Sequence, residues 1–324
     1  MSSVLLERPI FVVGCPRSGT TLVQCILSAS SEAFSLPETH FFSWVLPTLG
    51  LSAADAVREP ERVRIRRELK TEGQLELPAT FWSELEARPD QTALDVFLAI
   101  VEHHRPTSGL RAIEKTPRHV LHLDTIGELF PDAVFVNVVR DPIDVASSLL
   151  AVPFETSRSL LSQAQRWQQS IDAAHAYEAS NPGRLQTVVY DRLIRESEAQ
   201  VRQLCHFVEL TYEPRMLEEF GGEAARNITG NEPWKRDVGR GVLLNRSGVW
   251  RSRMTPGQAW LVAQATRSSA REFGFGPEPR ASAGSIAAAL AQEARIRYRE
   301  ARMSTGMVSA ARHAGSVLKT LSAA

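Results

Sequence analysis

The order of apolar and polar segments along the chain predicts alternating strands and helices. Short apolar runs that suit buried strands occur at residues 10–13 and 134–139, another strand is predicted at 185–190, and a helical pattern follows each of the three segments. The run at 134–139 is apolar except for Asn137, as expected of a parallel strand covered on both faces. The pattern therefore predicts an α/β fold with a central parallel sheet flanked by helices. Ligands of such folds bind at the carboxyl ends of the strands.

Two segments depart from this alternation. Residues 45–110 are predicted to be a helical insertion that shapes a binding pocket, with a charge-dense helical stretch at 55–77 and a second helix at 94–101. Residues 279–324 are rich in Ala and Arg, and we expect a helical tail there, helical from about 285 to 303. Residues 1–278, which include the insertion, are assigned to one main domain. Further helices are predicted at 119–130, 158–180 and 198–208.

The first apolar run leads into a glycine-bounded loop, residues 14–19 (GCPRSG), and then into a helix. Backbone N–H groups of such a loop and the helix N-terminus form a phosphate site, so the sheet is predicted to be P-loop-like. Nucleoside triphosphatases place a Lys after the second Gly to reach the β- and γ-phosphates. Here Thr20 holds that position and Arg17 is the only cation of the loop. The loop therefore suits a nucleotide with less phosphate charge than ATP.

Two motifs carry a family resemblance. One is the run PRSGTT at residues 16–21. The other is residues 134–148, where an apolar strand is followed by Arg140 and by a helical segment containing Ser148. In this order they resemble the sulfotransferases that use 3′-phosphoadenosine 5′-phosphosulfate (PAPS), and they are most similar to the tyrosylprotein sulfotransferase type. The resemblance implies PAPS as donor, adenosine 3′,5′-bisphosphate as product, and no requirement for a metal.

The resemblance also implies which residues bind the donor. The 5′-phosphate is assigned to the anion loop and the start of its helix, namely Arg17, Ser18, Gly19, Thr20 and Thr21. The 3′-phosphate is assigned to Arg140 and Ser148, and adenine to Tyr190, for which a buried core position is an equal alternative. A further arginine is expected at the 3′-phosphate, and Arg240, Arg246 and Arg251 all remain candidates.

Three residues are candidates for the chemistry. Arg17 would stabilise the leaving group as a permanent cation, and Lys115 would contact the sulfonate. Glu38 follows Arg17 by 21 residues and precedes a Thr, as the base of the tyrosylprotein enzymes does, and His40 is the rival base. For Lys115 the alternative is an ordinary salt bridge to Glu114 or Asp124.

Composition limits the setting in which the protein acts. A formal net charge of zero gives no global attraction to nucleic acid, and no apolar run approaches a membrane span. Three scattered cysteines (Cys15, Cys25, Cys205) and a polar N-terminus indicate reduced thiols and a cytoplasmic location. The expected partner is a small-molecule, glycan or lipid acceptor. The tail could pack on its own domain, form a homodimer contact, or lie as a basic helix on an anionic membrane.

Two other functions fit parts of the sequence. One is a small-molecule kinase with a P-loop, although the missing Lys and the Arg at the end of the 134–139 strand oppose it. The other is a non-catalytic nucleotide-binding protein, in which Glu38 and Lys115 would be incidental.

Overall fold

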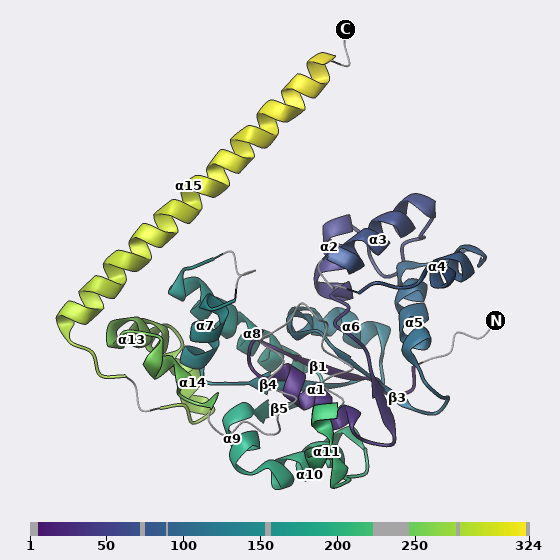
Figure 1. The fold of residues 1–324 in the computed structure, drawn as a ribbon, viewed down its shortest axis with the longest axis horizontal. Helices are drawn as coiled ribbons and strands as arrows, with labels where there is room; N and C mark the ends of the chain where they lie inside the picture. The colour runs from purple at the N-terminus through teal and green to yellow at the C-terminus, as the bar shows by residue number, and fades with distance from the viewer. Residues whose placement is uncertain are drawn as a thin grey trace. The chain divides into compact units, whose positions relative to one another are not determined.

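The computed structural model describes residues 6–71, 75–88, 90–152, 157–222, 246–276 and 279–321. The chain divides into two compact units, one formed by Met1–Asp141 and Gln169–Ser247, the other by Pro142–Gln168 and Gly248–Ala324. The predicted α/β fold is confirmed, because the first unit is built on a parallel sheet of five strands (Figure 1). The strands are β1 Ile10–Gly14, β2 Ala33–Ser35, β3 Arg111–Lys115, β4 Val134–Val139 and β5 Leu185–Val189.

The sheet has the order β2-β3-β1-β4-β5, and every neighbouring pair is parallel. All five strands therefore point their carboxyl ends to the same edge. The sequence analysis gives no range for strand β3, because charged residues stand at both of its ends. It pairs with β1 through Phe11 opposite Glu114 and Val12 opposite Lys115.

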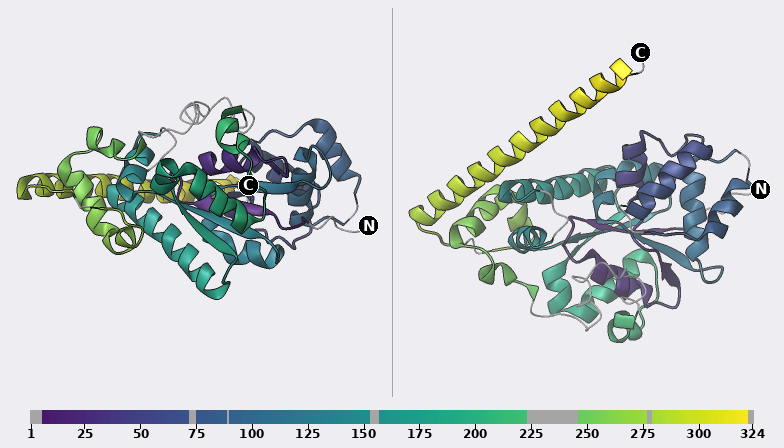
Figure 2. Two further views of the ribbon diagram at one scale, coloured as in Figure 1. Left: turned by 90° about the horizontal axis from the view of Figure 1, so that it is seen from below. Right: turned by 45° about the horizontal axis from the view of Figure 1, so that its top comes forward.

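Helices cover both faces of the sheet (Figure 2). On one face, Ile10 and Val12 of β1 pack against α1 Thr20–Ser28 and α10 Ser197–Val208. The helices α9 Tyr190–Arg195 and α11 Arg215–Glu218 belong to the same layer. On the other face, Phe11 and Val13 join an aromatic core that includes Phe97 and Phe130. The alternation of side chains along β1 thus serves two cores at once.

The predicted helical insertion lies between β2 and β3. It consists of η1 Phe41–Val45, α2 Leu46–Leu49, α3 Glu59–Thr71, α4 Ala79–Glu86 and α5 Ala93–His104. The charge-dense helix is shorter than predicted, and α4 was not predicted. Helix α5 begins with a capping box between Thr92 and Asp95, which fixes its N-terminus. The predicted helix at 119–130 is a 3₁₀ turn, η2 Pro117–His122, followed by α6 Leu123–Leu129.

The second unit contains α7 Pro142–Leu150, the first part of α8 Leu160–Ser180, η5 Val249–Ser252, α13 Pro256–Ala265, α14 Arg267–Glu272 and α15 Ala283–Leu321. The tail helix α15 is longer than the predicted 285–303. Its buried Glu293 accepts hydrogen bonds from the backbone N–H groups of Leu160 (2.9 Å) and Leu161 (3.3 Å) at the start of α8. A carboxylate there satisfies helix-start donors that have no partner within the helix. The early part of α15 therefore packs on its own unit.

Within the described residues, no helix is both long enough and apolar enough to span a membrane.

Candidate active site

Each strand of the sheet ends beside one of the candidate site residues. Arg17 comes three residues after β1, and Glu38 three residues after β2. Lys115 is the last residue of β3, and Arg140 directly follows β4. Tyr190 directly follows β5. Because the strands are parallel, the five residues share one edge of the sheet, in the order Glu38, Lys115, Arg17, Arg140, Tyr190.

The loop between β1 and α1 has the features of an anion site. No side chain caps the N-terminus of α1, and its first turn contains no acidic residue. Ser18 is fully buried, and its hydroxyl has no hydrogen-bond partner among the described residues. Arg17 is half-buried and adopts a left-handed backbone conformation with φ 76°. Uncapped N–H groups and a buried free hydroxyl fit a bound phosphate, so the loop suits the 5′-phosphate assigned to it.

Glycine is required at both ends of this loop. A Cβ on Gly14 would lie 2.4 Å from the carbonyl oxygen of Val138, so only glycine lets the end of β1 approach β4. A Cβ on Gly19 would lie 2.4 Å from Cδ2 of Tyr190, and Gly19 also has φ 102°. The ring of Tyr190 thus packs directly against Gly19, at the start of α1.

Replacing Gly19 by Ala is therefore expected to weaken binding of adenosine 3′,5′-bisphosphate by about tenfold or more and to cost about 1–3 kcal/mol of stability. Calorimetry and thermal denaturation measure the two effects. Gly50→Ala is the matched control, because Gly50 also has a positive φ (66°) but no heavy atom lies within 4 Å of the position that the new methyl group would take. Equal ligand affinity in both variants would contradict the role of the Gly19–Tyr190 contact.

Arg140 connects the loop with the ends of β4 and β5. It is 9% exposed, and its guanidinium lies 4.8 Å from the centre of the Tyr190 ring. Its Nη1 donates to the carbonyl oxygen of Arg17 at 3.5 Å, and its Nη2 donates to the carbonyl oxygen of Arg246. Tyr190 is 5% exposed and packs in the core beside the loop.

The other residues assigned to the 3′-phosphate fall in different parts of the chain. Ser148 is a half-buried residue of α7 and belongs to the second unit. Arg251 also belongs to that unit, where its guanidinium lies 4.5 Å from the Trp250 ring. Arg246 contributes its carbonyl group to Arg140, as described above. Arg240 lies outside the described residues.

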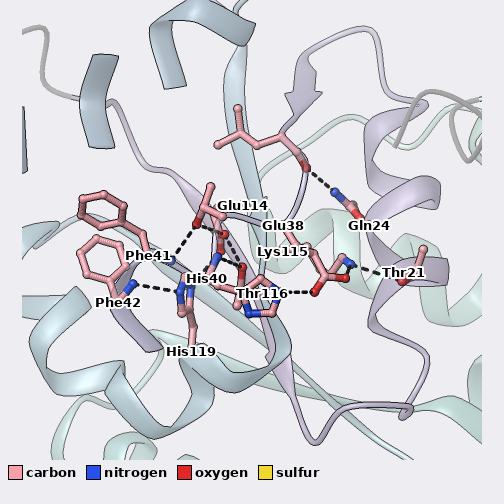
Figure 3. A network of polar contacts seen from close by, with 12 residues as sticks. Thr21, Gln24, Glu38, His40, Phe41, Phe42, Glu114, Lys115, Thr116 and His119 are labelled. Atoms are coloured by element: carbon pink, nitrogen blue, oxygen red, sulfur yellow. Dashed lines mark hydrogen bonds and ion pairs between the residues drawn. The ribbon is translucent and has the colours of Figure 1, made fainter. Parts of the chain in front are cut away.

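Glu38 and Lys115 form an ion pair between Oε1 and Nζ (Figure 3). Lys115 is 1% exposed, and its Nζ also donates to the hydroxyl of Thr21 at 3.3 Å. His40 Nε2 lies 3.2 Å from the second carboxylate oxygen of Glu38. The structure thus pairs Lys115 with Glu38, whereas the partners considered from sequence were Glu114 and Asp124. It also places both rival bases, Glu38 and His40, in contact.

A second polar cluster lies next to this pair and was missed by the sequence analysis. The carboxylate of Glu114, 2% exposed, accepts hydrogen bonds from Thr39 (2.8 Å), Thr116 (2.7 Å) and His119 Nδ1 (3.0 Å). Burial disfavours the charged form, but the interaction with His119 and the hydroxyl hydrogen bonds outweigh it, so the pKa of Glu114 lies below its ordinary value. The sequence signal that could have indicated this cluster is the run EKTPRH at 114–119, which contains Glu114, Thr116 and His119.

The residues after His40 belong to the hydrophobic core. The structure forms the helical turn η1 Phe41–Val45 there. The rings of Phe41 and Phe42 are 0% and 2% exposed and lie within 5.4 Å and 4.9 Å of the Phe97 ring centre. These contacts anchor the chain immediately beyond Glu38.

The sequence profile of the Sulfotransferase family matches residues 9–214, which include the loop, Glu38, Lys115 and Arg140. The chain belongs to the sulfotransferase family. A putative protein-tyrosine sulfotransferase of Caenorhabditis briggsae is 28% identical over 216 residues, 65% of this sulfotransferase and 69% of the relative. An uncharacterized Aquifex aeolicus protein is 27% identical over 224 residues, 66% of this chain and 27% of that longer protein. The zebrafish (Danio rerio) protein-tyrosine sulfotransferase 1 is 24% identical, and the aligned part covers 57% of it.

Solved structures agree on the fold. The sulfotransferase domain of the Synechococcus PCC 7002 olefin synthase superimposes with a TM-score of 0.60 at 18% identity, covering 84% of this sulfotransferase and 97% of that domain. The sulfotransferase domain from the curacin biosynthetic pathway gives 0.58 at 17% identity, covering 84% and 99%. In the part of the chain that the structure describes, no group of three or more His, Cys, Asp or Glu side chains is arranged to hold a metal ion.

Proposed function

We propose that this sulfotransferase transfers the sulfonate of PAPS to a hydroxyl or amine of an acceptor. The observation that carries the proposal is the Glu38–Lys115 pair, whose ammonium also contacts Thr21 at the start of α1. A carboxylate and an ammonium group thus lie beside the start of α1, within the five-residue edge of the sheet, which supports their assignment as proton acceptor and cation. A plain nucleotide-binding site does not require such a pair, and the kinase alternative is opposed by Thr20, which stands where a P-loop kinase has its Lys.

The chain's own residues supply the remaining parts of an in-line transfer. PAPS brings the sulfonate and a phosphate leaving group. Glu38 would take the proton of the acceptor hydroxyl as its oxygen forms the new bond to sulfur. Lys115 would balance the charge of the sulfonate oxygens. The bond from sulfur to the bridging oxygen breaks with its electron pair going to the phosphate, where Arg17 would stabilise the negative charge without giving up a proton.

The acceptor class and the cellular location are parts of the same proposal. Glycan, lipid, phenol and peptide tyrosine acceptors are all candidates, and the names of the nematode and zebrafish relatives make tyrosine peptides and phenols the first to test. Purified protein with radiolabelled PAPS and a panel of these acceptors would identify the class. A cytoplasmic location fits the three buried cysteines, all of them without a disulfide. A homodimer through α15 stays a proposal that light scattering tests.

The donor assignment predicts selectivity for the 3′-phosphate. Adenosine 3′,5′-bisphosphate should bind much more tightly than 5′-AMP, and Arg140→Ala should remove the difference. Each charged hydrogen bond that is lost costs about 1.5–3 kcal/mol, or about 10- to 150-fold in affinity. Calorimetry with both nucleotides measures the ratio.

Arg202→Ala is the control, because Arg202 is an exposed residue of α10 that pairs with Glu198 at 2.7 Å. It should leave the ratio unchanged. Tight magnesium-dependent binding of ATP would instead support a kinase. Nucleotide binding without transfer to any acceptor would support a non-catalytic protein.

A further inference from the structure

Glu114 is a buried carboxylate that faces away from the anion loop. It stands opposite Phe11 in the ladder of β1 and β3, whereas Lys115 stands opposite Val12. Neighbouring residues of a strand point to opposite faces of the sheet. Glu114 therefore points to the aromatic core that contains Phe11, and Lys115 points to the face covered by α1. An apolar side chain at position 114 would fill this space without the cost of burying a charge.

The contacts of Glu114 join the two segments that carry the proposed catalytic pair. One carboxylate oxygen, Oε1, accepts a hydrogen bond from Thr39, which directly follows Glu38 (2.8 Å). The same oxygen accepts a hydrogen bond from Thr116, which directly follows Lys115 (2.7 Å). A single atom thus ties the end of β3 to the chain that leaves β2.

The partners of Glu114 also hold the backbone beyond Glu38. The N–H groups of three successive residues, His40, Phe41 and Phe42, donate to the Thr116 hydroxyl (3.2 Å), the Thr39 hydroxyl (3.3 Å) and His119 Nε2 (3.3 Å). His119 Nδ1 in turn contacts Glu114 Oε2 at 3.0 Å. Figure 3 shows Glu114, Thr116 and His119 grouped beside His40.

This arrangement fixes a turn that is otherwise unfavourable. His40 has φ 51°, a left-handed conformation that non-glycine residues seldom adopt, and no side chain caps η1 at this residue. Such a conformation persists where surrounding contacts determine it. The same turn brings His40 Nε2 to within 3.2 Å of the Glu38 carboxylate.

We propose that Glu114 is a positioning residue. Through its hydrogen bonds to Thr39, Thr116 and His119, it holds the side chains of Glu38 and Lys115 in the orientation that transfer requires. The proposal rests on the proposed function for its kinetic consequence. Glu114 itself faces the core and touches neither sulfonate nor acceptor. Its effect falls on the orientation of the reacting groups, where small displacements have large effects on rate.

The test compares variants that alter single hydrogen bonds. In Glu114→Gln, the amide has one oxygen and one NH2 group, so it cannot accept both the threonine hydroxyls and His119 Nδ1–H. We expect kcat to fall by about 10- to 100-fold, with the Kd of adenosine 3′,5′-bisphosphate within about twofold. Thr39→Val and Thr116→Val should also lower kcat, and Thr39→Ser and Thr116→Ser, which keep the hydroxyl, should restore it.

A double variant and a core control separate positioning from loss of stability. Glu114→Gln combined with Thr39→Val should lose no more activity than Glu114→Gln alone, because both act through one contact. Phe130→Leu thins the aromatic core next to Phe42 and Phe97 and replaces none of the side chains that hydrogen-bond to Glu114. It should lower the melting temperature and keep kcat. An unchanged kcat in Glu114→Gln, or an equal loss of kcat in Phe130→Leu, would overturn the proposal.

A measurement that does not depend on turnover tests the role of Glu114 separately from the proposed sulfonate transfer. The chain has four lysines (Lys70, Lys115, Lys235 and Lys319), so acylation with acetic anhydride can be mapped to Lys115 by mass spectrometry. Lys115 is 1% exposed and paired with Glu38, and we expect slow acylation that becomes at least about tenfold faster in Glu114→Gln but not in Phe130→Leu. Faster acylation in a protein that transfers no sulfonate would overturn only the proposed function. Unchanged acylation in an active enzyme would overturn the role of Glu114.

Discussion

Replacing Glu38 by Gln is expected to lower turnover by about 100-fold or more, with the affinity for adenosine 3′,5′-bisphosphate nearly unchanged. Gln keeps the size of the side chain and can still accept a hydrogen bond from Lys115, but it is far too weak a base to take the acceptor proton. Transfer of radiolabelled sulfonate to an acceptor from the screen gives the turnover, and calorimetry gives the affinity.

The neighbouring His40 supplies the control for this prediction. His40 Nε2 lies 3.2 Å from Glu38, so the two side chains form a contact pair in which either could act as base. His40→Ala should reduce turnover less than Glu38→Gln does. If His40→Ala abolishes turnover and Glu38→Gln does not, the base is His40. Thermal denaturation of both variants is needed, because Glu38→Gln leaves the buried ammonium of Lys115 without its counter-charge.

The second large effect is expected for Lys115→Met. Met approximates the length of the Lys stem but carries no charge, so the sulfonate oxygens lose their cation, and we expect turnover to fall by about 100- to 1,000-fold. Adenosine 3′,5′-bisphosphate has no sulfonate, and its affinity should therefore change little. This contrast between a large loss of turnover and a small change in product binding is specific to a group that contacts the transferred sulfonate.

Lys70→Met is the matched control for the loss of one positive charge. Lys70 is an exposed residue of α3 and pairs with Glu76 at 2.7 Å, a contact of little energetic value in water. It should retain turnover. The double variant Glu38→Gln with Lys115→Met should lose less than the product of the two single effects, because the partners act together. Full turnover in Lys115→Met would assign Lys115 a structural role only.

The fold could be predicted from sequence where local patterns were strong. The strands at 10–13 and 134–139 were found because burial on both faces leaves little polar character. The strand at 185–190 was also found, although it lies at the edge of the sheet and contains the half-buried Gln186 and Thr187. The range of strand β3 could not be predicted because Arg111, Glu114 and Lys115 interrupt its apolar pattern, although the last two are buried. The tail helix exceeds its predicted length, since nothing in the helix propensities of its residues marks an end at 303.

The candidate site was predictable residue by residue but not as a set of contacts. Motif spacing pointed to Glu38 and Lys115 separately, but they are 77 residues apart and only the register of β2, β3 and β1 brings them together. From the sequence, Glu114 was only an alternative salt-bridge partner for Lys115. Its burial depends on which face of β3 meets the aromatic core, and this follows from sheet pairing that no local pattern encodes.

The strand order implies how such an enzyme can change its acceptor during evolution. Under the proposed roles, the sheet edge runs from proton acceptor to sulfonate cation, leaving-group cation, 3′-phosphate cation and finally Tyr190, so acceptor and donor chemistry occupy opposite ends. The insertion with α2 to α5 enters after β2 and returns at β3, entirely at the acceptor end. Strand β2 is an edge strand and hydrogen-bonds to β3 alone. An exchanged insertion therefore leaves the anion loop and β4 outside the replaced segment, but it must still fill the aromatic core that Phe97 of α5 shares with Phe11 of β1.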